Sequence, residues 1–528
     1  MTTSTPRFFI CRLYPVGMVK MKTGNILAEA LCICFLLIAL PAAATQKEPD
    51  SSISTKIVLE GDVRSGQNNT YVEVPFRVPK GIQRVTITFH YSEKEKHTAL
   101  DLGLMDPAGL RCWSGGNKTV LTVGFSDATP SCLPGPLPAG IWNILIGVPN
   151  IRAGVTSHYI AEIYFTRSGL VSEEPEVLRK PLRRGPTWYR GDLHMHTAHS
   201  DGQCASQAGE KVPCPVFLTV EAAARRGLDF IAITDHNATS QYDAMRELQP
   251  YFDKTLLIPG REITTFQGHI NVLGTTSFID FRLGSTNIPD TDTLLHNIQR
   301  SGGLISINHP EAPTGELCMG CGWTPKAAVD LGLVTAVEVV NGGSELNGTY
   351  GISFWDKQLN DGHRLTGIGG SDNHNPLSDP TRPSSVGNPT TVVFAPELST
   401  PAILAGIRSG HVFVDATASP SRVLTMTAKI GPATVLMGDS LEAGQHTSID
   451  FEVHEDGADE GKISLIEDGH VLNIPAPTSP MTGVLHTRWT SDGHRHWFRP
   501  QVNGPDGKLW MIGNPIYVNW DEPADHAK

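Results

Sequence analysis

Short apolar runs separated by turn residues dominate the first part of the chain. Segments such as KIVLEGDV, TYVEVPFRV and WNILIGV are rich in β-branched and aromatic residues and are split by turns of glycine, proline or asparagine. Strands of this length and spacing are typical of a β-sandwich. We therefore expect an N-terminal β-sandwich over residues 56–170, followed by a charged linker at 171–186.

The pattern changes to alternating strands and helices over residues 187–416. Strand-like GDLHMHT precedes helical TVEAAARRG, and similar units follow through LDFIAITDH, TLLHNIQRSGG, PKAAVDLGL and PAILAGIRSG. Repeated units of this length favour a parallel sheet, and their number favours a barrel whose site lies at the carboxyl ends of the strands. Residues 419–522 return to short β segments and predict a small C-terminal accessory domain.

Composition and charge exclude some partners. The chain has 528 residues and a formal net charge of −12, which disfavours a nucleic acid polymer or an anionic membrane as the partner of its whole surface. Residues 30–40 form an apolar run too short to span a bilayer, and small residues follow it up to Ala44. We expect residues 1–44 to be a signal peptide, no transmembrane segment in the mature chain, and export to the periplasm or the cell exterior.

Cysteine usage agrees with export. Oxidising compartments favour disulfides. The six cysteines that follow the predicted signal peptide allow about 15 pairings, and we predict that sequence neighbours pair. The expected pairs are Cys112–Cys132, Cys204–Cys214 and Cys318–Cys321. The single CxxC at Cys318 has no second CxxC beside it, which favours a structural disulfide over a redox or zinc motif. A glycosylation sequon at Asn237 directly follows the candidate ligand His236, which favours a bacterial source.

The segment GDLHMHTAHSDG, residues 191–202, carries the most informative chemistry. His194 and His196 alternate along a predicted strand, so their imidazoles face the same side. Asp201 follows in a turn, and His236 ends a second predicted strand. Two strand-borne histidines and a turn carboxylate suit a transition-metal site with nitrogen and oxygen ligands. The chain is therefore predicted to be a metallohydrolase.

Further candidate ligands occur in order at later strand ends. They are Glu262 in PGREIT, His269 in GHINVLG, His309 in SINHP, and Asp372 with His374 in GGSDNH. Together with the first segment, they could hold two or three divalent ions such as Zn, Mn or Fe.

This ordered set resembles the polymerase-and-histidinol-phosphatase (PHP) domain. The surrounding segments GREITTFQGHINVLG, VEVVNG and GIGGSDNHN are similar to the carbaryl-hydrolase-type (CehA/McbA) branch, and the resemblance covers residues 187–416. It implies an α/β fold with a distorted (β/α)7 barrel, flanked here by β-sandwich-like domains, and a site for two or three metal ions. The implied ligands are His194, His196, Asp201, His236, Glu262, His269, His309, Asp372 and His374.

Bound divalent ions would lower the pKa of water to about 7 and make hydroxide available at neutral pH. Asp235 is a candidate to orient this water or move its proton, or equally to orient a metal-bound histidine. His199, Arg261 and Asn237 are candidates for substrate contact or for protonation of the leaving group. Asn341 either lines the pocket or belongs to a turn.

Three functions remain open. The positive charge of clustered ions favours hydrolysis of phosphoesters, which are small anionic substrates. The scarcity of arginine and lysine in the motif loops weakens the phosphoester hypothesis. The resemblance to the carbaryl-hydrolase-type branch instead implies cleavage of a carbamate or carboxyl ester, and an amide is a further alternative at the same site. A catalytically inactive surface or glycan-binding protein is the third reading, and the complete ligand set argues against it. A second HxH, His494 and His496, has no carboxylate motif beside it and is interpreted as exposed β surface.

Overall fold

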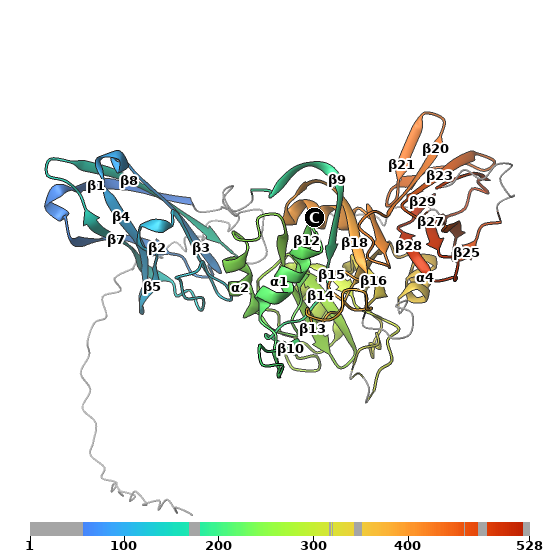
Figure 1. The fold of residues 1–528 in the computed structure, drawn as a ribbon, viewed down its shortest axis with the longest axis horizontal. Helices are drawn as coiled ribbons and strands as arrows, with labels where there is room; N and C mark the ends of the chain where they lie inside the picture. Colours follow the sequence, from blue (N-terminus) through green and yellow to red (C-terminus); the bar gives the residue numbers. More distant parts are fainter. Residues whose placement is uncertain are drawn as a thin grey trace, which may run out of the picture. The chain divides into compact units, whose positions relative to one another are not determined.

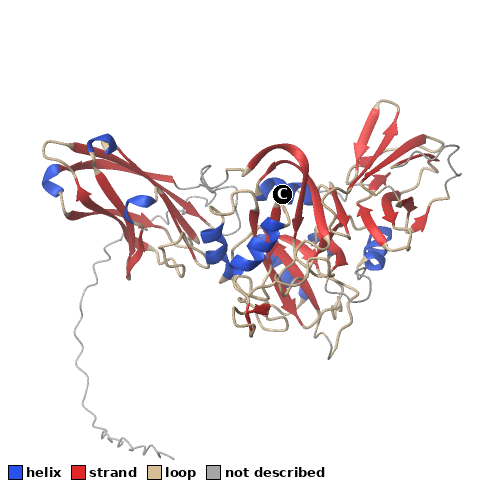
Figure 2. Ribbon diagram, in the orientation of Figure 1, coloured by secondary structure: helices blue, strands red, loops and turns tan. Residues whose placement is uncertain are grey.

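The structure, a computed structural model, describes most of the chain after the predicted signal peptide. The described residues are 56–167, 180–315, 318, 320–342, 351–458, 460–473 and 483–520. The predicted signal peptide and most of the predicted linker lie outside them. Strands far outnumber helices throughout the described residues, so the fold is mostly β-sheet (Figure 2).

Two antiparallel sheets of four strands form within residues 56–166, coloured blue to cyan in Figure 1. The first contains β1 (Lys56–Arg64), β8 (Thr156–Thr166), β3 (Arg84–Tyr91) and β6 (Val120–Gly124), and the second β2 (Thr70–Val78), β7 (Gly140–Asn150), β4 (Ala99–Asp106) and β5 (Gly109–Trp113). Trp142, Ile144 and Ile146 alternate along β7 and point into one hydrophobic core that both sheets share. The predicted disulfide Cys112–Cys132 is present here.

Most other strands belong to a mixed sheet of fifteen strands. Its main path is β17 (Thr366–Gly370), β16 (Ala336–Asn341), β15 (Leu304–Ile307), β14 (Gly268–Leu273), β13 (Leu256–Thr265), β12 (Phe230–Ile233), β9 (Arg183–Asp192), β18 (Thr390–Leu398), β19 (Val412–Asp415), β28 (Leu509–Gly513), β27 (His496–Asn503), β24 (Lys462–Glu467) and β25 (His470–Val471). Off this path, β29 (Ile516–Val518) pairs with β27, and β22 (Ser440–Leu441) pairs with β29.

Two smaller sheets complete the described strands. One is the hairpin of β10 (Gln203–Ala205) and β11 (Lys211–Pro213), and the other contains β21 (Ala433–Leu436), β20 (Val423–Ile430), β23 (Ser448–Asp456) and β26 (Val484–Thr490). The predicted C-terminal β segments therefore form strands. However, β28 pairs with β19, so the domain boundary expected between 416 and 419 lies within one continuous sheet.

The described residues contain five α-helices, all within the central region. They are α1 (Val216–Arg225), α2 (Gln241–Leu248), α3 (Thr291–Arg300), α4 (Ile352–Asn360) and α5 (Thr400–Arg408). In α3, the Asp290 side chain accepts a hydrogen bond from the Thr293 backbone N–H and caps the helix, and Leu294, Leu295 and Ile298 bury one face. None of the described helices is long and apolar enough to span a bilayer.

The expected (β/α)7 barrel is not what the structure shows. Strands β13 and β14 are joined by the short turn at Phe266 and Gln267, and they pair antiparallel because such a turn is too short for a crossover helix. The segment PKAAVDLGL forms only a 3-10 turn at Leu331–Leu333 instead of a crossover helix. Among the strands of the central region, only the β9–β12, β12–β13, β15–β16 and β16–β17 pairs are parallel.

The chain segments that follow β9 and β17 lie side by side, although these two strands are far apart in the order of the sheet. Met195 forms a parallel bridge with Asn373. The His196 N–H donates to the Asn373 carbonyl (2.8 Å), and the Asp372 N–H donates to the His194 carbonyl (2.8 Å). This pairing brings the polar residues after both strands to one place.

Candidate metal centre

The nine predicted ligands converge, seven from segments that follow strands and two, Glu262 and His269, from strands β13 and β14. His194, His196 and Asp201 follow β9, His236 follows β12, Glu262 and His269 lie on β13 and β14, His309 follows β15, and Asp372 and His374 follow β17. Each belongs to at least one group whose ligand atoms lie within 4.8 Å of one another. We call these nine residues the metal cluster.

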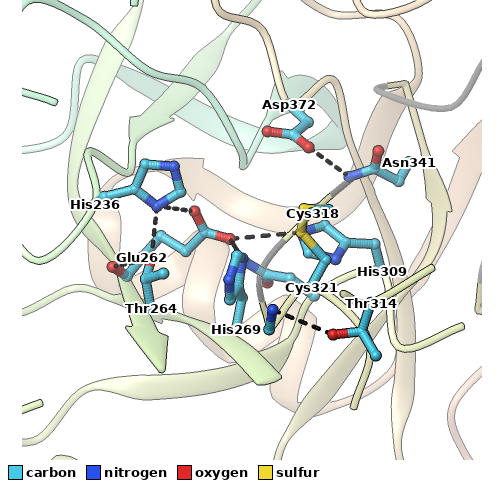
Figure 3. The surroundings of a disulfide bond; sticks show 12 residues. His236, Glu262, Thr264, His269, His309, Thr314, Cys318, Cys321, Asn341 and Asp372 are labelled. Atoms are coloured by element: carbon cyan, nitrogen blue, oxygen red, sulfur yellow. Dashed lines mark hydrogen bonds and ion pairs between the residues drawn. A yellow bond between two sulfur atoms is a disulfide. The ribbon is translucent and has the colours of Figure 1, made fainter. Parts of the chain in front are cut away.

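Glu262 lies at the centre of the cluster and is fully buried. Five imidazoles place a ring nitrogen near one of its carboxylate oxygens: His236 (2.7 Å), His269 (3.2 Å), His194 (3.3 Å), His196 (3.6 Å) and His309 (3.6 Å). Figure 3 shows its carboxylate between His236 and His269. The Asn308 side-chain N–H also donates to Glu262 Oε1 (2.8 Å) and holds this oxygen in place.

Two further carboxylates face the same imidazoles. Asp372 Oδ1 lies 3.2 Å from His196 Nε2 and 3.4 Å from His194 Nε2. Asp201 Oδ1 lies 3.4 Å from His374 Nε2 and 4.0 Å from His196 Nδ1. The rings of His196 and His374 stack with their centroids 4.2 Å apart. The cluster is therefore a continuous array of nitrogen and oxygen atoms rather than separate ion pairs.

Four ring nitrogens in the cluster are buried and make no hydrogen bond. They show whether the cluster is suited to metal ions. They are Nε2 of His194, His196 and His269, and Nδ1 of His309. A buried polar atom without a partner is costly, and native proteins seldom contain several together. If the imidazoles are neutral, the unprotonated nitrogens near carboxylate oxygens set lone pairs against lone pairs. A cation would relieve that arrangement, so the donor set fits divalent transition-metal ions.

The charges within the cluster shift the pKa values of its members. Burial lowers the pKa of His194, but the charges of Glu338, Asp372 and Glu262 outweigh it and raise this pKa well above its usual range. Burial opposes ionisation of Glu262 and Asp372, yet the neighbouring imidazoles, His194 foremost, hold the pKa of each carboxyl well below its usual range. Without a cation, protons on the imidazoles balance the carboxylates.

The same balance holds for the more exposed pair of Asp201 and His374. Despite the opposing effect of burial, the hydrogen bond and charge of His374 lower the pKa of Asp201 to about 2. Burial likewise opposes the charge on His374, but Asp201 and Asp372 raise the pKa of His374 to about 9. A metal ion at this position must therefore displace a proton at neutral pH.

Two ligands have backbone conformations that non-glycine residues rarely adopt. The φ angle is 52° at Asp372 and 26° at His309. Such conformations cost of the order of 1–3 kcal/mol and persist only where the surroundings hold them. Here the Asp372 N–H donates to the His194 carbonyl, and the His309 N–H donates to Glu338 Oε2 (3.1 Å). In these backbone conformations, the side chains of Asp372 and His309 lie in the cluster.

Two of the predicted catalytic residues, Asp235 and Arg261, form their hydrogen bonds with residues outside the metal cluster. Asp235 is fully buried, and its carboxylate accepts hydrogen bonds from the Thr197 N–H (2.7 Å), the Thr197 hydroxyl (2.7 Å) and the Ser200 hydroxyl (2.6 Å). It therefore fastens the loop that carries His196 and Asp201.

Arg261 precedes Glu262 on β13 and so points to the opposite face of the strand. Its guanidinium donates to the Ser277 carbonyl (2.9 Å) and lies 5.9 Å from the centre of the Phe278 ring.

Of the other predicted residues, His199 and Asn237 contact neighbouring segments of the chain, and Asn341 contacts the metal cluster. His199 Nδ1 contacts the Ser240 hydroxyl (2.7 Å). The Asn237 amide pairs with the Thr264 backbone through both its oxygen and its nitrogen (3.1 and 3.0 Å), which fixes the turn after His236. Asn341 reaches the cluster, with its Nδ2 3.5 Å from Asp372 Oδ2 (Figure 3).

Glu338 is not among the residues predicted from the sequence, but it also lies at the cluster and contacts His194. A buried charged residue inside the apolar strand AVEVVN was the signal that could have identified it.

Both remaining predicted disulfides are present, and they brace loops of the site. Cys318–Cys321 lies beside His309 and His269 in Figure 3. Cys204–Cys214 closes the segment after Asp201, where the Cys214 N–H donates to the Gly202 carbonyl (2.9 Å).

The comparison with known proteins gives a likeness in structure. A scan against protein-family models finds no match, and a search of curated proteins finds none either. One similar solved structure is a two-domain protein from Bacteroides vulgatus that contains a predicted PHP-like metal-dependent phosphoesterase. It is 18% identical, covers 63% of this chain and 95% of that chain, and has a TM-score of 0.35. At this level the function has to be inferred from the site itself.

Proposed function

We propose that this chain is an exported metal-dependent hydrolase of the PHP type, in the carbaryl-hydrolase-like branch, and that it cleaves phosphoesters. One observation carries the proposal. Buried imidazole nitrogens lie near the carboxylates of Glu262 and Asp372 and form no hydrogen bond. When two or three Zn, Mn or Fe ions are bound, they supply a nucleophile at neutral pH by lowering the pKa of water to about 7.

We assign different roles to the residues around the site. The nine members of the metal cluster hold the ions. Asn341 is the predicted residue whose side-chain N–H groups face the cluster, so we assign it to substrate contact. Asp235 and Asn237 keep the ligand loops in position rather than contacting the reacting atoms. We assign no proton transfer to Arg261, because its side chain lies on the opposite face of β13.

A second candidate is hydrolysis of carbamates, carboxyl esters or amides at the same site. It is favoured by one observation: among the described residues, the ion-pair partners of Glu262, Asp372 and Asp201 are all histidines, with no arginine or lysine among them. A phosphate would then be held by the ions alone, whereas a neutral carbonyl substrate needs no fixed cation. Metal chemistry supports both reactions.

Elemental analysis combined with a substrate panel tests the proposal. Purified mature protein should contain stoichiometric transition metal and hydrolyse nitrophenyl phosphate or bis-nitrophenyl phosphate. Turnover of naphthyl methylcarbamate alone would replace the phosphoesterase assignment with the second candidate. If the protein contains no stoichiometric metal and His194→Ala changes no activity, it is a surface-binding protein instead.

Export is a separate part of the proposal, supported by the three disulfides. Expression in a bacterium followed by cell fractionation should place the mature chain, cleaved near Ala44, in the periplasm or the medium. Recovery of the full-length chain from the cytoplasm with free thiols would contradict it.

A further inference from the structure

Glu338 on β16 is a buried carboxylate that contacts two ligands of the metal cluster without belonging to the predicted set. Its oxygens accept hydrogen bonds from His194 Nδ1–H (3.0 Å), the His309 backbone N–H (3.1 Å) and the Asn341 side-chain N–H (2.9 Å). We propose that Glu338 is a positioning residue that fixes the ring of His194 and the backbone of His309 and thereby sets the metal affinity of the cluster. This inference rests on the proposed function.

The contact with His194 determines which ring nitrogen can bind a metal ion. A neutral imidazole carries one proton, and a carboxylate can only accept, so Glu338 places that proton on Nδ1. The lone pair of Nε2 then points toward Glu262 Oε1 (3.3 Å) and Asp372 Oδ1 (3.4 Å). A carboxylate that orients a ligating histidine in this way typically changes metal affinity about 10–100-fold when it is lost.

Glu338 could itself be considered a ligand, because one of its oxygens lies near nitrogens of His194 and His309. Its hydrogen bonds argue for orientation instead. Oε1 faces the Nδ1–H of His194, and Oε2 accepts from both His309 and Asn341. With three N–H donors directed at its two oxygens, Glu338 has its acceptor capacity largely taken up by the protein.

The neighbouring strand leaves room for this contact. Gly370 on β17 pairs with Asn341, and a Cβ atom at Gly370 would overlap both Glu338 Oε1 and the Cβ of His194. A β-bulge between Glu338 and Val340 adjusts the register at the same point. The absence of a side chain at position 370 is therefore what lets the carboxylate approach His194.

Glu338→Gln is the informative substitution because it keeps the volume of the side chain. A glutamine offers one acceptor oxygen and one NH2 donor, whereas all three partners of Glu338 donate. Whichever way the amide is turned, a donor faces a donor, so either His194 or His309 loses its support.

Asp415 provides a matched control. It is as deeply buried, and it accepts hydrogen bonds from Arg190 and Thr417 but from no member of the cluster. Asp415→Asn therefore removes a buried carboxylate of similar importance to the fold without touching a ligand.

The test is a cobalt(II) chloride titration of metal-free, full-length mature protein, followed by visible absorption and equilibrium dialysis. We expect Glu338→Gln to weaken cobalt binding at least about tenfold and to change the absorption spectrum, with Asp415→Asn like the wild type. Unchanged affinity and spectrum in Glu338→Gln, or equal weakening in Asp415→Asn, would overturn the positioning role. Absence of cobalt binding by the wild type would instead overturn the proposed function.

A second measurement needs no substitution at Glu338. In wild-type protein loaded with zinc chloride and labelled with 15N-histidine, the His194 signal can be assigned by its loss in His194→Gln. We expect a proton on Nδ1 and none on Nε2. A proton on Nε2, with Nδ1 bound to zinc, would overturn the inference even if Glu338→Gln does not fold.

Discussion

Two groups in this protein combine histidine with carboxylates but differ in their hydrogen bonding. One is the metal cluster, and the other, which we call the C-terminal cluster, contains Glu467, Asp468, Asp492 and His496. In the C-terminal cluster, His496 Nδ1 lies 2.6 Å from Asp468 Oδ2, and His496 Nε2 lies 3.1 Å from Asp492 Oδ1. Both ring nitrogens of this histidine are already paired.

The metal cluster differs because four of its ring nitrogens are buried and make no hydrogen bond. Nε2 of His194 and of His196 are buried beside Asp372 Oδ1 and have no hydrogen-bond partner. Composition and proximity alone therefore do not identify a metal site. What distinguishes it is a set of buried lone pairs that only a cation can satisfy.

The largest expected effect comes from removing metal from the protein. Dialysis against a chelator should abolish hydrolysis, because the nucleophile depends on bound ions. Returning zinc at about a thousandfold excess over its dissociation constant should stabilise the fold by about 4 kcal/mol, measured as a rise in the thermal midpoint by circular dichroism.

The same zinc addition sharpens the comparison of the two clusters. His496→Gln should show the same rise in midpoint as the wild type, because both ring nitrogens of His496 are already hydrogen-bonded to carboxylates. If the rise in midpoint disappears in His496→Gln but persists in His194→Ala, the zinc binds at the C-terminal cluster and not at the metal cluster.

Asp372→Asn should have the next largest effect. It replaces a carboxylate near His194, His196 and His374 with a neutral amide and so leaves positive charge uncompensated. We expect metal content to fall and hydrolysis to drop at least about 100-fold, measured together by elemental analysis and initial rates. Activity lost at unchanged metal content would mean that Asp372 acts on the substrate rather than on the ions.

The affinity of the metal cluster should also depend on pH, with a sign that the pKa values determine. His374 has a pKa of about 9 in the metal-free protein and an ordinary value of 6.5. Below pH 9 its proton must leave before an ion binds, so affinity should rise by about tenfold per pH unit for each displaced proton between pH 6.5 and 9.

Without metal, the raised pKa of His374 has the opposite consequence for the fold. A group whose pKa is higher in the folded state stabilises it fully below pH 6.5, and that contribution is lost as the pH rises through 9. Cobalt titrations and melting curves at matched pH values check both trends. Affinity that is flat over this range would show that His374 is no ligand.

The sequence predicted the members of the metal cluster better than the fold that holds them. Ligands such as His194 and Asp372 follow apolar strands, and their position at strand ends is visible in the pattern. The connection between β13 and β14 is only two residues long. It is too short for a crossover helix, so the two strands pair antiparallel and do not form the parallel strand–helix–strand unit expected of a (β/α)7 barrel. Alternation of apolar segments does not reveal such a hairpin.

Residues adjacent to ligands in the sequence were harder to interpret. Arg261 is next to Glu262, but neighbours on a strand face opposite sides, so adjacency argued against a shared site. Asp235 precedes His236, but its carboxylate accepts hydrogen bonds from Thr197 and Ser200 in the loop after β9. Glu338 is distant in sequence from both His194 and His309, so only the folded structure reveals their contact.

The smallest expected effect is that of His496→Gln on the C-terminal cluster. The pKa of His496 is raised because Asp468 and Asp492 outweigh the opposing effect of burial, and the side chain is only 16% exposed. Glutamine can replace one of its two hydrogen bonds, so we expect a loss of about 1 kcal/mol in the free energy of unfolding. Metal content and rates should match the wild type. A fall in metal content with normal folding would show that paired ring nitrogens do not exclude ligation, and the criterion that separates the two clusters would fail.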